Sequence, residues 1–496
     1  MKTKLIFAAV LVLLMTACSE EFLSLPSRED LTTAEFFQSQ SDFEFAVNGI
    51  YAPIREWYGP NTDVSTSPLF ITGDIHSDNA RYALNPNYRA TQAVETPADF
   101  IPEQTLFSGY WNTFYQWISR CNQVIGNIDD VDFDAEAKAN LKGQALFLRS
   151  HSYWWLLRLY GQAVLQLDPV TTLDQTSKPL SSEAEVKAQI IADASDAASM
   201  LPGKADQEAG RVTSGAAYML LADVHMWYGE WAEAEAALNN VTGYSLLTDY
   251  AEIYDPANKN HAESIWEIQY SSASADYASS FVYNMFPYPF DVAQVEMYTG
   301  VSNPIALTSG EMFCVPTPEL LGKYEVGDLR LDASVMYVDD ANGLNFPMCI
   351  KYMHPHSTFR QSNDNLPIYR YAETLLYLAE AINEQGGRLG VAQGHLNEVR
   401  NRAGLPNTTA ATQEELRQAI LDERQVEFAM EGKRWWDLVR TESVDEVIGA
   451  YGSNVKADPE SYYFPAGYET VPSAFTNIAT TFNLPDDEIR LNSEID

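Results

Sequence analysis

The chain has 496 residues and is strongly acidic, with 31 Lys and Arg against 69 Asp and Glu and a formal net charge of −38 at pH 7. Such a body repels phosphate backbones and anionic membrane surfaces, which excludes nucleic acid as a partner and favours a neutral or cationic ligand. In a chain of this length, the 4 cysteines do not indicate a fold held together by disulfides.

The N-terminus has the pattern of a bacterial lipoprotein signal. Lys2 and Lys4 precede the apolar run 5–15, and small residues then lead to Cys18. Because the run is too short for a permanent transmembrane helix, we predict that residues 1–17 are a cleaved signal peptide. Cys18 is then the lipid anchor, since two or more acyl chains hold a protein stably on a membrane. The alternative is an ordinary signal peptide followed by a cysteine without lipid.

A polar tether, 18–30, separates this anchor from the folded body. Apolar residues at helical spacing follow it up to about residue 50. Pro and Gly residues then interrupt the segment 59–108, which predicts a long loop insertion. Loops of this length inside a compact body are usually functional or disordered.

Three helices are predicted next, at 109–128, 135–160 and 183–200. The helix 135–160 has the strongest pattern, because its apolar and small residues from Leu141 to Leu159 recur every three or four positions. Further large apolar residues widen this stripe. The helix is therefore expected to be buried on more than one side.

Two helical hairpins follow, at 212–241 and 368–402. Each has small residues where its two helices would touch and a Gly-containing turn, which is typical of a tetratricopeptide unit. Between them lies the insertion 242–367, which is rich in Tyr, Pro, Ser and Asn and contains short extended pieces such as 265–268. Because the two hairpins are not adjacent, we expect the insertion to interrupt any superhelix.

The last long helix is predicted to start after Thr412, where Thr-Gln-Glu-Glu forms a capping box. It is expected to break near Gly432 and to end at about Thr441. The tail, 442–496, is predicted to be irregular.

The motifs of catalysis are missing. The chain contains no CxxC pair, no HExxH, no GxSxG elbow and no phosphate-binding Gly loop. The expected signatures of catalysis are therefore absent from the sequence, and we predict no cofactor. His354 and His356 are interpreted as loop residues, because no Cys or carboxylate cluster completes a metal site. For Cys314 and Cys349, both a bridge and buried free thiols are compatible with the sequence.

The charged run 423–434 could suggest paired catalytic carboxylates. Its Glu and Arg residues are helix-face neighbours, which favours a structural ion-pair network over a glycosidase dyad flanking a cleft. The tryptophans of the helices are predicted to be core residues. They are Trp154, Trp155, Trp227, Trp231, Trp435 and Trp436.

Several segments, taken in order, resemble the SusD/RagB family of outer-membrane lipoproteins over nearly the whole mature chain. The family's opening segment is similar to EEFLSLPSREDLTTAEFFQSQSDFEFAVNGIY, its long central helix to KGQALFLRSHSYWWLLRLYGQAVL, and its helical hairpin to GRVTSGAAYMLLADVHMWYGEWAEAEAAL. Its C-terminal half is similar to YRYAETLLYLAEAINEQGG, LNEVRNRAGLP and DERQVEFAMEGKRWWDLVRT. The shared order and spacing carry the resemblance.

The resemblance implies a mostly α-helical fold, an irregular tetratricopeptide-like scaffold whose long loop insertions form the ligand site. It divides the chain into an N-terminal region, 31–241, and a C-terminal region, 242–496. It also implies a surface-exposed lipoprotein of the outer membrane, and the acidic pair after Cys18 resembles a surface-export signal of Bacteroidetes. Such proteins bind an oligosaccharide and cover a SusC-like TonB-dependent transporter, without being enzymes.

Candidate ligand-binding residues come from both insertions, because sugar recognition needs flat apolar faces and forked polar groups. The prolines of YNMFPYPF would stiffen an exposed aromatic platform and reduce the entropy lost on binding. The alternatives are that the aromatics pack against the scaffold and that the charged residues form a turn with an internal ion pair. The candidates are Asp78, Asn79, Arg81, Tyr82 and Tyr88 in the first insertion and Tyr283, Phe286 and Tyr288 in the second.

Two other functions remain compatible with the sequence. A helical secreted polysaccharide lyase or glycosidase would share its length, secretion and aromatic content. A peptide-binding member of the same family is the other alternative, because aromatic residues and Asn also suit the binding of peptide backbones. The sequence identifies neither the glycan nor its linkage.

Overall fold

The structure is a computed structural model that describes residues 36–59, 68–81, 104–302, 304, 314–464, 466–467, 469–470, 474–476 and 478–495. The predicted signal peptide, Cys18 and the tether lie outside these residues. Within the described residues, no helix is both long and apolar enough to cross a membrane.

The protein is mostly helical, as predicted. In the described part of the chain the α-helices are α3 (Gln40–Tyr58), α4 (Pro68–Phe70), α5 (Gln104–Asn127), α6 (Ala135–Tyr160), α7 (Glu183–Met200), α8 (Ser214–Trp227), α9 (Trp231–Leu238), α10 (Phe281–Met285), α11 (Val292–Thr299), α12 (Pro318–Leu321), α13 (Arg330–Ser334), α14 (Tyr371–Gln385), α15 (Leu389–Arg402), α16 (Gln413–Glu427), α17 (Arg434–Arg440), α18 (Val444–Ala457) and α19 (Asp486–Leu491). A π-helical turn, η2 (Ile71–Ile75), continues α4. The 3-10 turns are η4 (Ile128–Asp130), η5 (Leu173–Gln175), η6 (Ala251–Ile253), η7 (Ala275–Tyr277) and η8 (Pro459–Tyr462).

The strands form small antiparallel pairs. They are β1 (Ala80–Arg81) with β3 (Val315–Pro316), β2 (Ser264–Ile268) with β6 (Leu366–Arg370), and β4 (Val335–Asp339) with β5 (Asn345–Cys349). The first pair joins the two insertions, because Arg81 lies opposite Val315. The extended piece predicted at 265–268 is β2.

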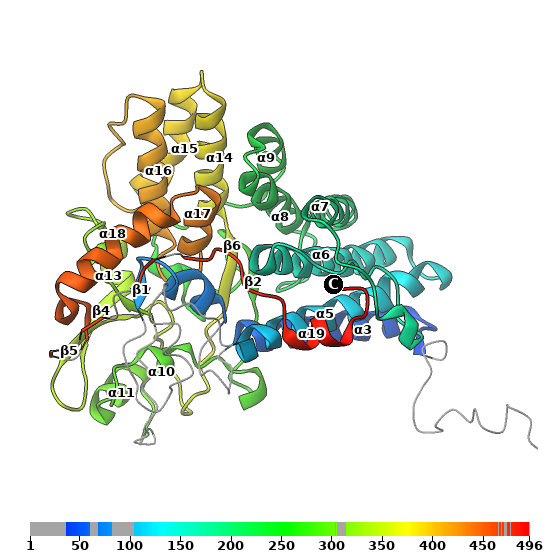
Figure 1. Ribbon diagram of the computed structural model, residues 1–496, viewed down its shortest axis with the longest axis horizontal. Helices are drawn as coiled ribbons and strands as arrows, with labels where there is room; N and C mark the ends of the chain where they lie inside the picture. The colour runs from blue at the N-terminus through cyan, green and yellow to red at the C-terminus, as the bar shows by residue number, and fades with distance from the viewer. Residues whose placement is uncertain are drawn as a thin grey trace, which may run out of the picture.

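The long helices stack in one continuous layer (Figure 1). From α5 to α9 each helix packs on the next, α9 packs on α14, and α14 also contacts α15 and α16. The two tetratricopeptide-like hairpins, α8–α9 and α14–α15, are therefore neighbours in space. The prediction that the insertion 242–367 interrupts the stack of hairpins is therefore wrong, because this segment leaves the helical layer and the chain then returns to it.

Local signals set the helix ends where the prediction was accurate. Asp134 caps α6 by accepting a hydrogen bond from the Ala137 backbone N–H, and Gly161 ends the helix with φ 70°. The capping box at Thr412 is present at the start of α16. The expected break is also present, because Gly432 has φ 73° between α16 and α17.

One predicted boundary and the predicted irregular tail are wrong. Residues 368–370 belong to strand β6 instead of the following helix, because their backbone pairs with β2. The tail is not irregular throughout, since it contains α18. Val444, Ile448, Tyr451 and Val455 are its buried stripe, at spacings of three and four residues.

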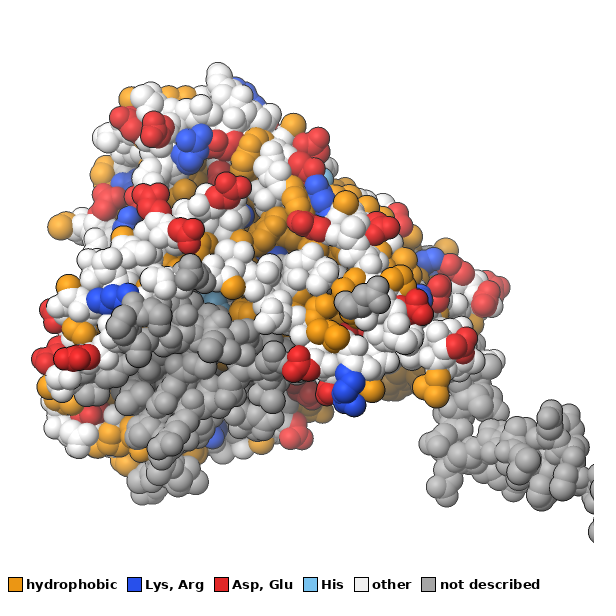
Figure 2. Space-filling model, in the orientation of Figure 1, with side chains coloured by type: hydrophobic (Ala, Val, Ile, Leu, Met, Phe, Trp, Pro, Cys, Tyr) orange, Lys and Arg blue, Asp and Glu red, His pale blue; other side chains and the backbone are white. Residues whose placement is uncertain are grey.

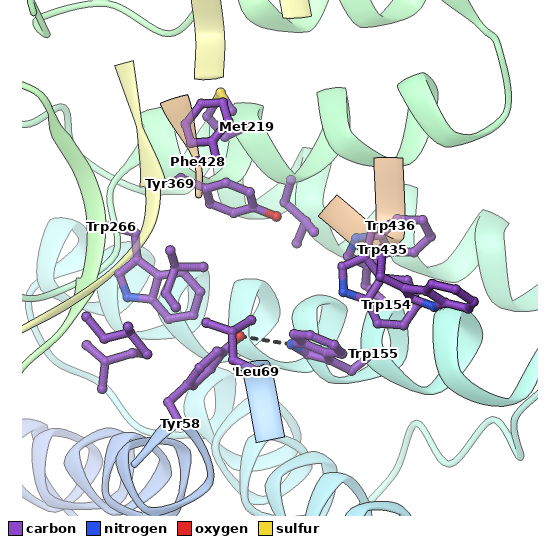
Figure 3. Packing of buried hydrophobic residues seen from close by; sticks show 14 of the residues in the cluster. Tyr58, Leu69, Trp154, Trp155, Met219, Trp266, Tyr369, Phe428, Trp435 and Trp436 are labelled. Atoms are coloured by element: carbon purple, nitrogen blue, oxygen red, sulfur yellow. Dashed lines mark hydrogen bonds between the residues drawn. The ribbon is translucent and has the colours of Figure 1, made fainter. Parts of the chain in front are cut away.

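The core is aromatic, as Figure 3 shows. Trp155 is 2% exposed and donates a hydrogen bond from its indole N–H to the Tyr58 hydroxyl at 2.9 Å. Trp154 is fully buried and donates to Asp223 at 2.8 Å. The prediction of core tryptophans is confirmed for Trp154, Trp155, Trp435 and Trp436, whereas Trp227 and Trp231 are half-buried against the core.

The charged run of α16 and the turn after it is a buried ion-pair network, as predicted. Its partners come from distant elements instead of the same helix face. Glu427 pairs with Arg330, Arg370 and Arg402. Burial opposes ionisation of Glu427, but these three guanidinium groups outweigh it and lower its pKa.

The three cysteines of the described residues, Cys121, Cys314 and Cys349, are buried and free. The alternative of a Cys314–Cys349 bridge is therefore wrong. Burial raises the pKa of each thiol, which makes them unreactive members of the core.

Candidate functional site

The polar residues predicted in the first insertion are buried at its base. The carboxylate of Asp78 is 2.8 Å from the Arg434 guanidinium, and Gln425 donates to Asn79 at 2.9 Å. The alternative of an ion pair inside the turn is thus also wrong, because the partner of Asp78 lies in α17. With 4% and 1% exposure, Asp78 and Asn79 do not meet the expectation of an exposed site.

Arg81 is likewise buried, at 3% exposure, and it fastens the insertion to the C-terminal region. Its guanidinium lies 3.3 Å from the ring centroid of Phe464 and donates to the backbone carbonyl of Tyr462. A cation held over an aromatic face in a dry environment stabilises that packing. Tyr82 and Tyr88 lie outside the described residues, and their role stays a prediction.

In the second insertion, Tyr283 and Phe286 form an inner wall instead of an exposed platform. They are 0% and 1% exposed, and the Tyr283 hydroxyl is hydrogen-bonded to His356 at 2.5 Å. Burial raises the pKa of Tyr283 to about 12. The expectation of exposure is wrong here because helix α10 turns its aromatic residues onto the core, where Phe281 meets Phe70.

Tyr288 has a different position, because it is only half-buried. It packs against Val315 together with Phe346 and Tyr463, and we call these four residues the Val315 cluster. Tyr463 contacts Phe346 at a ring-centroid distance of 6.0 Å and donates from its hydroxyl to the Pro316 carbonyl at 3.1 Å. Since Val315 is paired with Arg81, the two insertions do converge, as expected.

A β-hairpin, β4–β5, stands beside the Val315 cluster. It is docked on the 288–290 segment by a backbone hydrogen bond of 2.7 Å from Ala341 to the Pro289 carbonyl and by a bridge between Phe290 and Asp340. Residues Val338 and Phe346 are directly opposite each other across the two strands, and Val338 is buried. The hairpin therefore turns one face toward the core.

Near its turn, the other face of the hairpin is exposed and combines an aromatic ring with polar groups, whereas Val335 and Cys349 farther along this face are buried. Because side chains alternate along a strand, Tyr337 and Asp339 share this face with Asn345, the partner of Asp339. Tyr337 is 57% exposed, and the Asn345 amide donates to the Asp339 carboxylate at 2.6 Å. We call Tyr337, Asp339 and Asn345 the hairpin face.

This arrangement suits a neutral, hydroxyl-rich ligand. An exposed phenol ring offers an apolar surface for the C–H face of a sugar, and an amide–carboxylate pair offers donors and acceptors to its hydroxyls. Burial raises the pKa of Tyr463, and Tyr337 raises it further. Because Phe346 projects to the side opposite Tyr337, the Val315 cluster supports the hairpin from behind, and the hairpin face is the exposed part of the candidate site.

The sequence interpretation missed Tyr337, Phe346 and Tyr463. A signal for the first two was available, because Asn342-Gly343 between short apolar runs is typical of a β-hairpin turn, and Gly343 has φ 80°. For Tyr463 no local signal existed. Within the described ranges, no group of three or more His, Cys, Asp or Glu residues is placed to hold a metal ion.

Comparisons with known proteins match most of the chain. A family model described as "SusD family" matches residues 339–496, and one described as "Starch-binding associating with outer membrane" matches residues 22–226. A SusD-like protein of Formosa agariphila is 27% identical over 492 residues, which cover 89% of this chain and 90% of the relative.

Two solved structures share the fold. A laminarin-binding SusD-like protein is 24% identical, with a TM-score of 0.72 over 93% of this chain and 99% of its own. Surface glycan-binding protein A from Bacteroides thetaiotaomicron, in complex with laminarihexaose, is 24% identical, with a TM-score of 0.69 over 92% of this chain and 98% of its own.

Proposed function

Because the chain belongs to the SusD/RagB family, we propose that it captures an oligosaccharide or polysaccharide at the cell surface without cleaving it and delivers it to a SusC-like TonB-dependent transporter. The relatives that bind laminarin and laminarihexaose support a carbohydrate as the ligand. The acidic composition also favours a neutral ligand over an anionic one.

The observation that carries this proposal is the hairpin face beside the Val315 cluster. It belongs to the second insertion, and Tyr337 presents its ring to solvent while the surrounding aromatics hold the hairpin in place. A ring fixed by a rigid support loses little conformational freedom when a ligand stacks on it. The ligand is therefore proposed to lie on Tyr337, with its hydroxyls at Asp339 and Asn345.

A non-catalytic role is supported by the state of the buried carboxylates. Glu423 and Glu427 are 4% and 0% exposed and are paired with arginines, as is Glu431. A glycosidase needs two carboxyl groups flanking an accessible cleft, with one of them able to donate a proton. Groups enclosed in ion pairs support a structural role instead.

The proposed location is the outer leaflet of the outer membrane, with Cys18 as the lipid anchor. The N-terminal signal pattern and the family model whose description names the outer membrane support it. Figure 2 shows acidic side chains spread over the visible face of the body. Such a surface would keep the body away from anionic headgroups while the lipid holds it nearby.

The test is to incubate the purified mature chain with a panel of neutral glycans and a panel of peptides. Binding is measured by calorimetry, and the supernatants are analysed for new reducing ends and unsaturated products. We expect binding to at least one glycan, with no product formed. Turnover abolished by a single carboxylate substitution would refute the capture function, and binding to peptides alone would favour the peptide-binding alternative. Co-purification of a TonB-dependent transporter with the lipidated chain tests the partner.

A further inference from the structure

A groove of about 650 Å³ lies along helix α5 on the helical scaffold, apart from the β4–β5 hairpin (Figure 1). Its walls come from helix α5, the segment 164–176 and Glu488 of helix α19, which contacts α5 (Figure 1). Sites for small ligands usually occupy about 300–1,000 Å³, so this groove is large enough for several sugar rings. Among the described residues, neither insertion contributes to its lining.

Buried polar side chains fix the wall opposite α5. Asn122, which is 1% exposed, donates to the Gln166 carbonyl at 2.8 Å and to the Asp168 carbonyl at 3.3 Å. The Tyr153 hydroxyl is hydrogen-bonded to both backbone groups of Gln166 at 2.8 Å. A wall held in this way is ordered before any ligand arrives, which lowers the entropy cost of binding.

The floor of the groove is aromatic. Trp111 is 1% exposed and donates from its indole N–H to the Glu488 carboxylate at 3.2 Å. Tyr115 lies next to it, with the ring centroids 5.0 Å apart, and is half-buried, so that part of its ring faces the groove. Its hydroxyl is fixed by the backbone of Val164. The phenol is therefore a fixed apolar surface.

The rim on α5 carries polar side chains at helical spacing. Asn112, Gln116 and Ser119 are exposed, line the groove and lie on one face of the helix because they are four and three residues apart. Within the described part of the chain, these three side chains have no hydrogen-bond partner. Two amides and a hydroxyl offer both donors and acceptors without a net charge, and the charges of the lining, Arg120 and Glu488, balance.

We propose that this groove is a second carbohydrate site, which binds a neutral oligosaccharide through Asn112, Gln116 and the ring of Tyr115. The inference rests on the proposed function, because it assumes that the chain binds glycan. It adds a separate site on the helical scaffold. Two sites on one body would hold a polysaccharide more firmly than either alone, provided that one chain can reach both.

The test uses laminarihexaose as the probe and the soluble mature chain. Calorimetry is expected to give two sites per wild-type chain and one site for the double variant Asn112→Ala/Gln116→Ala. Both residues are exposed, so the variant is expected to keep the wild-type melting temperature. Gln418→Ala, which removes an exposed glutamine from α16, is the matched control and is expected to retain both sites. Hydrogen exchange at 161–170 should slow on ligand addition in the wild type and in Tyr337→Ala, but not in the double variant.

The outcomes separate the two proposals. A single site per wild-type chain that is lost in Tyr337→Ala, with unchanged exchange at 161–170, would overturn the groove site and leave the proposed function intact. Protection of 161–170 by peptides instead of glycans would also overturn it. Absence of binding to laminarihexaose and to every glycan of the panel would refute the proposed function, and the groove site with it.

Discussion

Asp74 offers a test of how the base of the first insertion is held. It lies in the π-helical turn η2, is fully buried, and accepts a hydrogen bond of 2.6 Å from the backbone N–H of Gly432. Burial raises its pKa from 3.8 to about 7, although Lys351 acts in the opposite direction. The contact is close, because a Cβ at Gly73 would clash with the backbone of Gly432.

The raised pKa makes the stability of the protein depend on pH. The contribution of protonated Asp74 to the free energy of unfolding is fully present below pH 3.8, where the unfolded chain also binds the proton. This contribution is lost as the pH rises through about 7. A difference of about 3 pKa units corresponds to about 4 kcal/mol. Asp74→Asn keeps the shape and the acceptor for Gly432 and removes the charge. The variant should therefore match the wild type near pH 4 and exceed its free energy of unfolding at pH 8 by up to about 4 kcal/mol.

The assay is urea unfolding of wild type and Asp74→Asn at steps from pH 4 to pH 8. When the free energy of unfolding of one protein is subtracted from that of the other at each pH, the contributions of all other titrating groups cancel. Asp196→Asn, which changes an exposed carboxylate of α7, is the control and should show a small difference at every pH. A difference between Asp74→Asn and wild type that does not vary with pH, or a variant that is less stable at pH 8, would refute this reasoning.

Three further predictions follow from buried and terminal groups. Burial opposes ionisation of Glu431, but Arg370 and Lys351 outweigh it and lower its pKa to about 2. Glu431→Gln should therefore be less stable than the wild type at pH 7. In unfolding curves, this loss of stability should shrink as the pH falls from 4.5 toward 2. Tyr283→Ala should lower the free energy of unfolding by about 3 kcal/mol, measured by urea titration, because it empties a buried site; wild-type stability would show that its ring is not packed. Cys18→Ala should leave the precursor unprocessed or release the chain from the outer membrane, and a mature variant still in that fraction would contradict the anchor.

Helices could be predicted where the signal was local. The spacing in 135–160 and the capping box at Thr412 act within one or two turns, and both elements form as predicted. The same rules were sufficient for α18, whose stripe at Val444 and Ile448 was overlooked. Residues 368–370 could not be assigned in this way, because their partner strand is about 100 residues earlier in the chain.

The candidate site was predictable only in outline. The two insertions meet, because Arg81 pairs with Val315, but the residues of the hairpin face and the Val315 cluster come from the second insertion and the C-terminal tail. Which side chains face outward depends on contacts between distant segments. Asp78 and Arg434 are 356 residues apart, and no local pattern pairs them. Tyr283 and Tyr288 have similar sequence surroundings, yet the first faces the core and the second reaches the Val315 cluster, because α10 ends between them.

The most direct test of the central claim is the affinity of the hairpin face for the glycan found in the panel. Tyr337→Ala removes the exposed ring, and by analogy with other aromatic stacking it should cost about 1–3 kcal/mol of binding, or roughly 5- to 150-fold in Kd, with an unchanged melting temperature. Tyr277→Ala, which removes a 50% exposed tyrosine that lies under Arg55 of α3, is the control and should keep wild-type affinity. If calorimetry shows that folded Tyr337→Ala binds the glycan as tightly as the wild type, the hairpin face is not the binding site.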